Sequence, residues 1–362
     1  MFFKKKSALL SVALGSMLAL SACGSDETAG GSDGVDSDPG ADAGGETYDW
    51  RFVTEEWPGQ VQYVYAERFA EKLHEKSDGR INIDVFEFGG LGSEVDQVEM
   101  LQTGGVELAI ISPGFTGTLV PEANVFALQF LFTDDLRLNQ DILNSSEAIN
   151  THLAAKYEEQ NILPLSFWHE GAMQWTGSNE LRSPEDFNGF KMRTQESPFI
   201  LRSYEAYGAD PTPLSWGELY TGLDTGLVDG QENPIFFIED ANFHEVQDHM
   251  TLSNHNIYVT MTTVNPDFFN GLPGDIQDMI LETVEEMRDV AYEIQEEQNE
   301  ALLASIENDT DNPTTIIELT EDERNAFRER AMPVRDFFVD EVGADGQMIL
   351  EMLQAEIEEA QN

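Results

Sequence analysis

The chain has 362 residues, and its 69 acidic side chains against 19 basic ones give a formal net charge of −50. A molecule this negative repels polyanions, which excludes nucleic acids and anionic membrane surfaces as electrostatic partners. Such a charge is typical of proteins adapted to high salt, where the Debye length shrinks to about 3 Å at 1 M. An anionic ligand would therefore need a local positive site that works against the field of the whole molecule.

The first 23 residues have the pattern of a targeting segment. Lys4, Lys5 and Lys6 precede an apolar run over 8–20 that is short for a membrane span. Small residues then lead to Cys23, and the string Leu-Ser-Ala-Cys resembles a bacterial lipobox. We therefore expect a lipoprotein signal peptide over 1–22 and lipid attachment at Cys23. An ordinary signal peptide with an incidental cysteine is the alternative.

Cys23 is the only cysteine in the chain, which excludes an internal disulfide and a thiolate metal site. After it, residues 23–47 are rich in Gly, Ser, Asp and Ala and offer little to bury, so they predict a disordered tether. The folded part begins near Tyr48 and is long enough for two domains.

The first folded segment alternates strands and a helix. Strand patterns over 50–54 and 81–88 flank a helical pattern over 61–76, which predicts a parallel sheet with crossover helices. Glu55 and Glu56 follow the first strand at its carboxyl end, where such sheets hold ligands. Because neighbouring residues point in opposite directions, we expect only one of them to face the cleft.

The next segment supplies a third strand and a loop. Residues 106–112 read as a strand, and Phe115 follows in a Gly-flanked loop, either as a wall of the cleft or as packing. An amphipathic helix over 143–161 and a strand over 162–168 come next. Gly89–Gly92 lacks the spacing of a phosphate-binding loop and predicts a turn.

Alternating apolar and basic residues mark a strand over 190–194. The pattern buries Phe190 and Met192 and directs Arg193 to an open surface at the carboxyl end of the strand. Ser183–Asp186 before it predicts a short capped helix. A second strand and turn over 228–234 could bring its polar tip to the same space.

Four strings in this region carry a resemblance: 191–193 (KMR), 208–211 (GADP), 213–220 (PLSWGELY) and 228–234 (VDGQENP). They resemble the substrate-binding proteins of tripartite ATP-independent periplasmic (TRAP) transporters, the DctP type. The resemblance implies an extracytoplasmic α/β protein with a two-lobed, periplasmic-binding-protein-like (Venus flytrap) fold. It also implies that Arg193 holds a ligand carboxylate and that integral membrane subunits of the permease are partners.

The resemblance also suggests how the lobes are divided. It implies one lobe from 48–168 and 259–298 and a second from 169–258 and 299–362. Apolar residues recur at helical spacing from 273 to 306, which predicts a helix of roughly 50 Å. This helix resembles the one that bridges both lobes in the family.

Strings at Glu55–Glu56, 112–117 and 233–236 resemble the ectoine-binding branch of the family. Ectoine carries one carboxylate and one delocalised cation. The resemblance implies that Arg193 pairs with the carboxylate, that Glu56 neutralises the cation and that Asn233 adds a hydrogen bond. It further implies stacking by three aromatic residues: Phe115, Trp216 and Phe237.

Two residues in this scheme have other interpretations. Trp216 could instead cap a domain core. Met173 stands where many family members carry a second arginine, which argues against a ligand with two anionic arms and offers an adaptable apolar surface.

Other function classes remain as alternatives. The ligand could be a C4-dicarboxylate, a keto acid or a sugar acid, and the protein could be a sensor ectodomain. A hydrolase is disfavoured because His244 and His249 are five residues apart and no Gly-x-Ser-x-Gly string occurs. We expect no catalysis, no cofactor and no metal.

Overall fold

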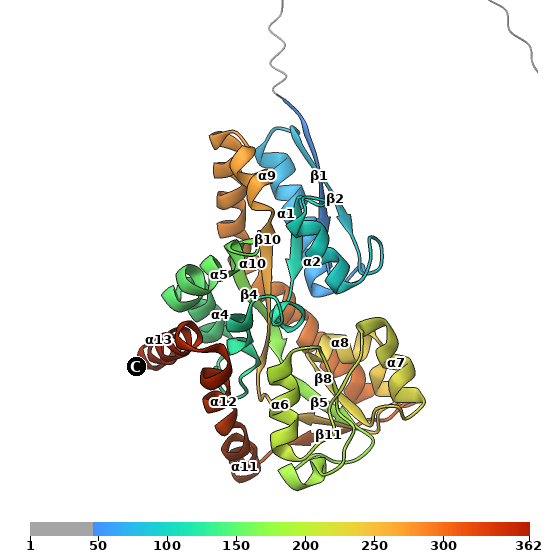
Figure 1. Cartoon of the computed structure of the whole chain (residues 1–362). Helices are drawn as coiled ribbons and strands as arrows, with labels where there is room; N and C mark the ends of the chain where they lie inside the picture. The colour runs from blue at the N-terminus through green and yellow to red at the C-terminus, as the bar shows by residue number, and fades with distance from the viewer. Residues whose placement is uncertain (1–45) are drawn as a thin grey trace, which may run out of the picture. The chain divides into compact units, whose positions relative to one another are not determined.

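A five-stranded sheet organises the first half of the fold. The computed structural model describes residues 46–362, and this sheet has the strand order β2-β1-β3-β10-β4 (Figure 1). Strand β1 runs parallel to β2 and β3, while β10 is antiparallel to β3 and β4. The carboxyl ends of β1, β2 and β3 therefore meet at one edge. The strands are β1 (Tyr48–Val53), β2 (Ile81–Phe86), β3 (Leu108–Ile111), β4 (Leu163–Ala172) and β10 (Ile257–Val264).

Two helices connect the parallel strands. Helix α1 (Val61–Lys76) has the bounds that the sequence predicts, and it buries Tyr65, Phe69 and Leu73 at helical spacing. Helix α2 (Glu94–Gln102) begins at a capping box in which Ser93 and Asp96 satisfy each other's backbone donors. The residues between β2 and α2 form turns, as expected for Gly89–Gly92.

A smaller sheet with the order β11-β9-β5-β8 organises the second half. An aromatic cluster that includes Trp175, Phe187 and Tyr204 forms its core. A pair of short parallel strands, β6 and β7, lies beside β8. The strands are β5 (Gln174–Gly177), β6 (Arg193–Thr194), β7 (Thr212–Pro213), β8 (Gly230–Asn233), β9 (His249–Leu252) and β11 (Thr315–Glu318).

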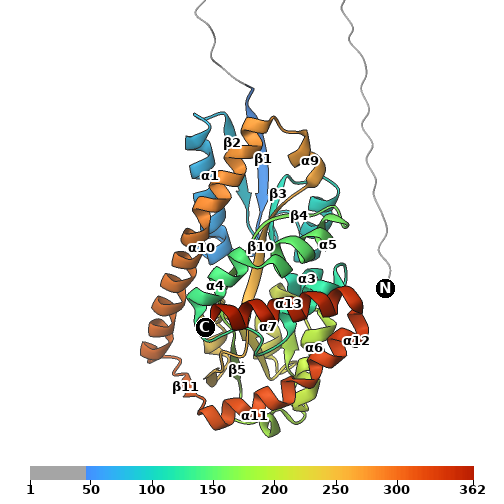
Figure 2. The ribbon, with the colours of Figure 1, turned by 90° about the vertical axis from the view of Figure 1, so that its left-hand side faces the viewer.

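The two sheets are joined by the passages from β4 to β5 and from β9 to β10, and by one long helix. Helix α10 (Gly274–Asn308) packs against α1 and β4 of the first half (Figure 2) and against α8 (Ile235–Asp240) of the second. Gly171 near the first passage has φ +118°, and a Cβ there would lie 2.6 Å from Asn299 Nδ2 on α10. The close approach of strand and helix therefore requires glycine.

The predicted helix over 143–161 starts earlier and is interrupted. It comprises α4 (Leu136–Ser145), a π-helical turn η2 (Ala148–Leu153) and α5 (Ala154–Glu158). The short helix expected near Ser183 is the 3₁₀ helix η3 (Pro184–Phe187). The other helices are α3 (Pro113–Thr116), η1 (Pro121–Ala127), α6 (Pro198–Tyr207), α7 (Trp216–Asp224), η4 (Phe243–Glu245), α9 (Pro266–Gly271), α11 (Glu321–Ala331), α12 (Pro333–Val342) and α13 (Ala344–Ala360).

The C-terminal helices pack on both halves. Helix α11 packs on α6, whereas α13 packs on η1, η2 and α4 beside the first sheet (Figure 2). The lobe bounds given above stay a prediction. The expected signal peptide, Cys23 and nearly all of the tether lie outside the described residues. Within 46–362, no helix is both long and apolar enough to cross a membrane.

Candidate functional site

A hollow of about 270 Å³ lies between the two halves of the fold, and we refer to it as the central hollow. Side chains from the ends of β1, β6, β8 and β10 and from helices α2, α3, α7 and α8 converge on it. Five of the predicted site residues meet here. Its lining residues are Glu55, Glu94, Phe115, Arg193, Gln195, Trp216, Asn233, Phe237 and Tyr258.

Arg193 provides the positive charge of the central hollow. Its Nε and Nη2 donate to the backbone oxygen of Leu214 at 3.1 and 2.9 Å, and no carboxylate among residues 46–362 lies within 4.0 Å of the guanidinium. Burial lowers the pKa of Arg193, yet a guanidinium stays charged. A buried cation with donors to spare calls for an anion.

The expectation that Arg193 reaches an open surface was wrong. The side chain is only 3% exposed, because Leu214 and residues of the opposite half, such as Glu94, cover it. The alternation itself is confirmed, since Phe190 and Met192 are buried and Lys191 is exposed. Only Arg193 and Thr194 of the predicted strand form a ladder, with β7.

Glu55 provides a carboxyl group in the same hollow. Its Oε1 accepts from the backbone N–H of Ser112 at 3.0 Å, while its buried Oε2 has no partner. Burial raises the pKa of Glu55 to about 8. Glu94 in the first turn of α2 likewise has a buried Oε1 without a partner, and burial raises its pKa. The hollow thus opposes two carboxyl groups to one guanidinium.

Glu56, which we expected to meet the ligand's cation, does not line the central hollow. Its Oε2 accepts from the backbone N–H of Gln62 at 2.6 Å, and Gln62 Nε2 donates to Glu170 Oε1 at 2.8 Å. Burial and the neighbouring Glu170 raise the pKa of Glu56, and burial raises that of Glu170 to about 7. Of the two adjacent glutamates, Glu55 is the one that faces the hollow.

Aromatic side chains form much of the remaining wall. The ring centroids of Trp216 and Phe237 are 4.8 Å apart, and those of Phe237 and Tyr258 are 5.7 Å apart. Trp216 also packs on Phe243, so it serves both the hollow and the apolar core. Its buried Nε1 has no partner and remains free to donate. Phe115 lines the hollow from the first half.

Asn233 comes to the central hollow at the end of β8. Its Nδ2 donates to Gln231 Oε1 at 2.5 Å on the same strand. This bond leaves the amide oxygen without a partner among the described residues. Asn233 therefore presents a hydrogen-bonding group beside the guanidinium of Arg193.

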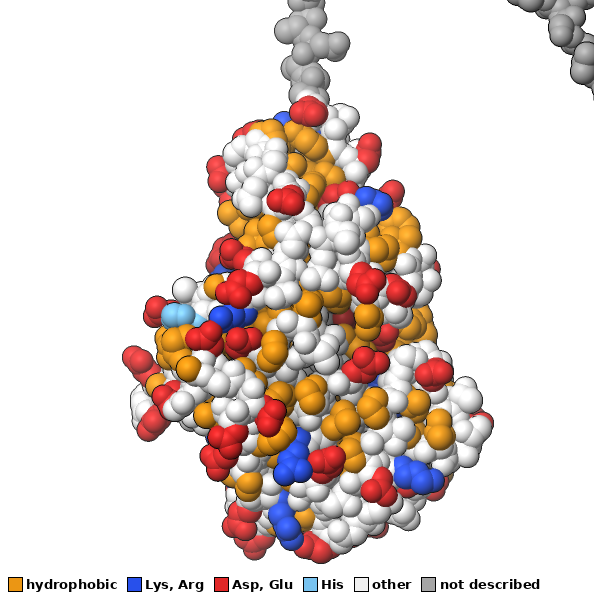
Figure 3. All heavy atoms as spheres, in the orientation of Figure 1, with side chains coloured by type: hydrophobic (Ala, Val, Ile, Leu, Met, Phe, Trp, Pro, Cys, Tyr) orange, Lys and Arg blue, Asp and Glu red, His pale blue; other side chains and the backbone are white. Residues whose placement is uncertain are grey.

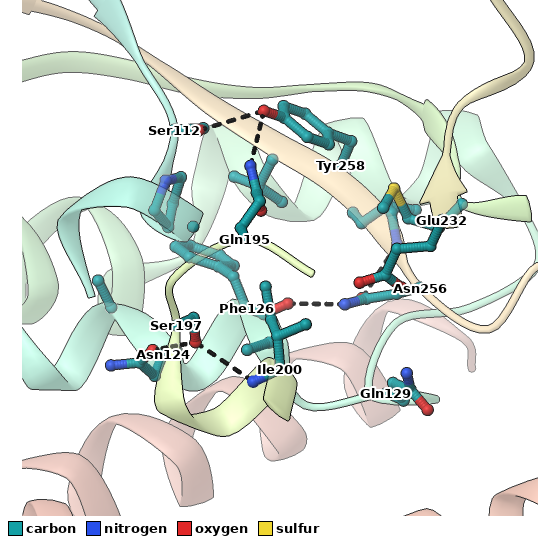
Figure 4. Close-up of a pocket in the computed structure, with 17 residues that line it drawn as sticks. Ser112, Asn124, Phe126, Gln129, Gln195, Ser197, Ile200, Glu232, Asn256 and Tyr258 are labelled. Atoms are coloured by element: carbon teal, nitrogen blue, oxygen red, sulfur yellow. Dashed lines mark hydrogen bonds between the residues drawn. The ribbon is translucent and has the colours of Figure 1, made fainter. Parts of the chain in front are cut away.

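Met173 lies in a different place. It lines a second cavity of about 510 Å³, which we refer to as the second cavity (Figure 4). Of the residues that the structure describes, this cavity shares only Gln195 and Tyr258 with the central hollow. Met173 therefore does not contact the space beside Arg193, although it is buried close to the passage between the two sheets.

Three lining residues were not predicted from the sequence: Glu94, Gln195 and Tyr258. Glu94 lies in the first turn of α2, where an acidic residue is common because it stabilises the helix N-terminus. Tyr258 lies in β10, a strand in which every residue is buried, so the sequence pattern does not single it out. Gln195 follows Arg193 by two residues, and this same-face spacing was the one available signal.

The remaining sequence features do not form a second site. His244 lies on η4 and His249 on β9, so no zinc-binding helix exists there. Among residues 46–362, no group of three metal-binding side chains occurs. Acidic side chains are scattered over the visible face, with few basic ones between them (Figure 3).

Comparison with known proteins gives one family match. Residues 52–341 match the model of the bacterial extracellular solute-binding proteins, family 7 (DctP). The ectoine-binding periplasmic protein TeaA of Halomonas elongata is 36% identical over 86% of this chain and 91% of its own length. The C4-dicarboxylate-binding periplasmic protein DctP of Rhodobacter capsulatus is 33% identical over 77% and 83%.

Solved structures share the fold. The periplasmic ectoine-binding protein of the TeaABC TRAP transporter of Halomonas elongata superposes with a TM-score of 0.83 at 35% identity, covering 86% of this chain and 99% of that one. The sugar acid-binding protein DctPAm of Advenella mimigardefordensis, in complex with galactonate, gives 0.80 at 26%, covering 87% and 99%. The predicted two-lobed α/β fold with a long bridging helix is confirmed.

Proposed function

Because this chain belongs to the DctP family of bacterial extracellular solute-binding proteins, which serve TRAP transporters, we propose that its central hollow captures a small zwitterionic carboxylate, with ectoine or hydroxyectoine as the leading candidates. The protein is a binding protein and not an enzyme. It works outside the cytoplasm, and its partners are a small-molecule ligand and the membrane subunits of the permease.

The observation that carries the proposal is the charge pattern of the central hollow. Arg193 has no carboxylate partner among the described residues, and Glu55 on the opposite half has a free buried oxygen. A ligand with one carboxylate and one cation satisfies both groups at once. A dicarboxylate would place its second charge among Glu55 and Glu94, where like charges disfavour it.

The walls suit a flat or ring-shaped body between the two charges. Phe115, Trp216 and Phe237 offer aromatic faces for a delocalised cation, and Asn233 offers one more hydrogen bond. Because these groups come from both halves, the ligand contacts both only when the halves are together. A ligand that prefers this form by about 5.5 kcal/mol would move the population from 1:99 to 99:1.

We also propose that Cys23 carries a lipid and that 23–47 tethers the folded part to the membrane. The lipobox-like string before Cys23 supports this anchor. Replacing Cys23 with Ala should move the protein from the membrane fraction to the soluble extracytoplasmic fraction. An unchanged distribution would contradict the anchor and leave the ligand proposal intact.

A thermal-shift screen tests the ligand. Ectoine, hydroxyectoine, succinate, malate, keto acids and sugar acids should be compared at equal concentration, because binding to the folded state raises the unfolding temperature. We expect the largest increase with ectoine or hydroxyectoine. Stabilisation by succinate or malate but not by ectoine would overturn the zwitterion assignment and favour the C4-dicarboxylate ligand named for the Rhodobacter capsulatus relative.

A further inference from the structure

We propose that Gln195 and Tyr258 form a wall that separates the central hollow from the second cavity, and that this wall limits the length of the acid that the protein accepts. The inference rests on the proposed function, because it assumes that the central hollow holds the ligand. It assigns to Gln195 a role in specificity rather than in charge recognition.

The geometry of the wall is simple. Among residues 46–362, Gln195 and Tyr258 are the two that line both spaces. Gln195 Nε2 donates to Tyr258 Oη at 3.1 Å, and Tyr258 Oη donates to Ser112 Oγ at 3.2 Å (Figure 4). The three side chains therefore form a continuous hydrogen-bonded row between the two spaces.

The wall draws on both halves of the fold. Tyr258 belongs to β10 of the first sheet, whereas Gln195 follows β6 on the other half. The wall is therefore complete only when the two halves are together, which is also the arrangement that surrounds the ligand. The wall therefore limits the length of the bound acid when the two halves close around it.

The structure holds the Gln195 side chain in place. A Cβ on Gly114 would overlap the Gln195 carboxamide, so the backbone of α3 presses directly on it. Two residues later, Ser197 Oγ donates to Asn124 Oδ1 at 2.6 Å across the halves (Figure 4). Asn124 Nδ2 in turn donates to Gly117 O at 2.7 Å. The segment that carries Gln195 is thus fastened to the loop that faces it.

The second cavity has the chemistry for an uncharged polar tail. Its lining mixes polar groups such as Ser112 and Asn256 with apolar ones such as Met173 and Ile200. Among the described residues no Lys, Arg or His lines it, and Glu232 does. A second carboxylate would meet Glu232 without a cation, so the tail that suits this cavity carries hydroxyl groups. Polyhydroxy monocarboxylates such as galactonate belong to this class.

The test compares the affinities for ectoine and galactonate in three proteins by calorimetric titration. Gln195→Ala removes the wall. Gln129→Ala is the matched control, because Gln129 lines only the second cavity, where it accepts a hydrogen bond from Tyr207. Thermal unfolding of all three proteins confirms that each variant is folded.

We expect Gln195→Ala to shift the affinity ratio toward galactonate by at least about tenfold, while Gln129→Ala keeps the wild-type ratio. An unchanged ratio in Gln195→Ala overturns the proposal. So does a wild-type protein that already binds galactonate as tightly as ectoine, or a Gln129→Ala protein that shifts equally.

Failure of the proposed function gives a different result. If the wild-type protein binds a short acid that carries no cationic group, the zwitterion assignment falls, and the same ratio is measured with that acid in place of ectoine. If the wild-type protein binds galactonate and no short acid, both proposals are overturned.

Discussion

Two buried glutamates on opposite sides of the fold show what distinguishes a binding group from a structural one. Glu232 on β8 is 8% exposed, and its Oε2 accepts from Tyr204 Oη and lies 2.7 Å from His255 Nε2. Glu55 is 5% exposed and has one backbone donor and one oxygen without a partner. Burial is alike in the two, but the Glu232 carboxylate has protein partners, whereas Glu55 brings a buried oxygen without a partner to the wall of the central hollow.

The network around Glu232 extends further into the second half. Trp175 Nε1 donates to Tyr204 Oη at 2.9 Å, and the ring of His255 stacks on Trp175 with centroids 4.6 Å apart. Ser253 Oγ lies 2.7 Å from His255 Nδ1. Every polar member has a protein partner, so this cluster stabilises the aromatic core without needing a ligand.

The largest effect on stability should follow from breaking this network. Glu232→Ala leaves His255 and Tyr204 without their shared acceptor, and each buried donor left unsatisfied costs about 1–3 kcal/mol. Urea unfolding should show a loss of this size. A loss below about 1 kcal/mol would mean that the pairing is not structural, and the comparison with Glu55 would fail.

The largest effect on binding should follow from Arg193→Ala. Removing a buried, hydrogen-bonded charge from a pair costs about 2–5 kcal/mol, which corresponds to roughly thirtyfold weaker binding or more. Calorimetry with ectoine measures this loss, and urea unfolding checks that the variant is folded. Retained affinity would refute the role of Arg193.

Arg193→Lys provides the matched variant for geometry. An ammonium keeps the charge but cannot form two parallel hydrogen bonds to a carboxylate. We expect an affinity between those of the wild type and Arg193→Ala. Wild-type affinity in this variant would show that charge alone suffices.

A smaller effect should follow from Glu55→Gln. The amide keeps the size of the side chain and removes the charge that opposes the ligand's cation, so ectoine should bind about tenfold more weakly or worse. Unlike Glu232→Ala, this change should not lower the free energy of unfolding near neutral pH, because the amide oxygen of Gln can still accept from the backbone N–H of Ser112 and the buried Glu55 carboxyl is itself mostly protonated there. Glu56→Gln is the control, and an equal loss of affinity in it would contradict the assignment of Glu55.

The smallest effect concerns pH. The pKa of Glu55 rises from 4.5 to about 8 on folding, so the stability it contributes is full below pH 4.5 and is lost as the pH rises toward about 8. A cationic ligand group favours the carboxylate, so ectoine binding near pH 7 should release up to about one proton. Calorimetry in buffers of different ionisation enthalpy measures this release. Equal release from Glu55→Gln would assign the proton to another group.

The sequence predicted most of the frame and the charged end of the site. Helix α1 and the long helix α10 emerged from apolar spacing, and the strings around Arg193 and Asn233 placed both residues in one region. The local sequence pattern could not decide between Glu55 and Glu56. Alternation predicts that the two side chains point in opposite directions, but it does not predict which of them points into the cleft. That choice depends on how Gln62 and Ser112 satisfy the two carboxyl groups.

The wall between the central hollow and the second cavity could not be predicted from the sequence. Gln195 and Tyr258 are 63 residues apart and come from different sheets, so only the assembled fold brings them together. The position of Met173 in the second cavity could not be predicted for the same reason, because it depends on contacts between distant parts of the chain. Its position in the chain is adjacent to the passage between the sheets, but its neighbours in the second cavity include residues from 112 to 259.

A crystal structure of the protein with ectoine would show directly whether the central hollow is the binding site. We expect the ligand in the central hollow, with its carboxylate within hydrogen-bonding distance of the Arg193 guanidinium and its cationic group against Glu55. A ligand bound elsewhere, or one bound in the hollow without contacting Arg193, would contradict this expectation.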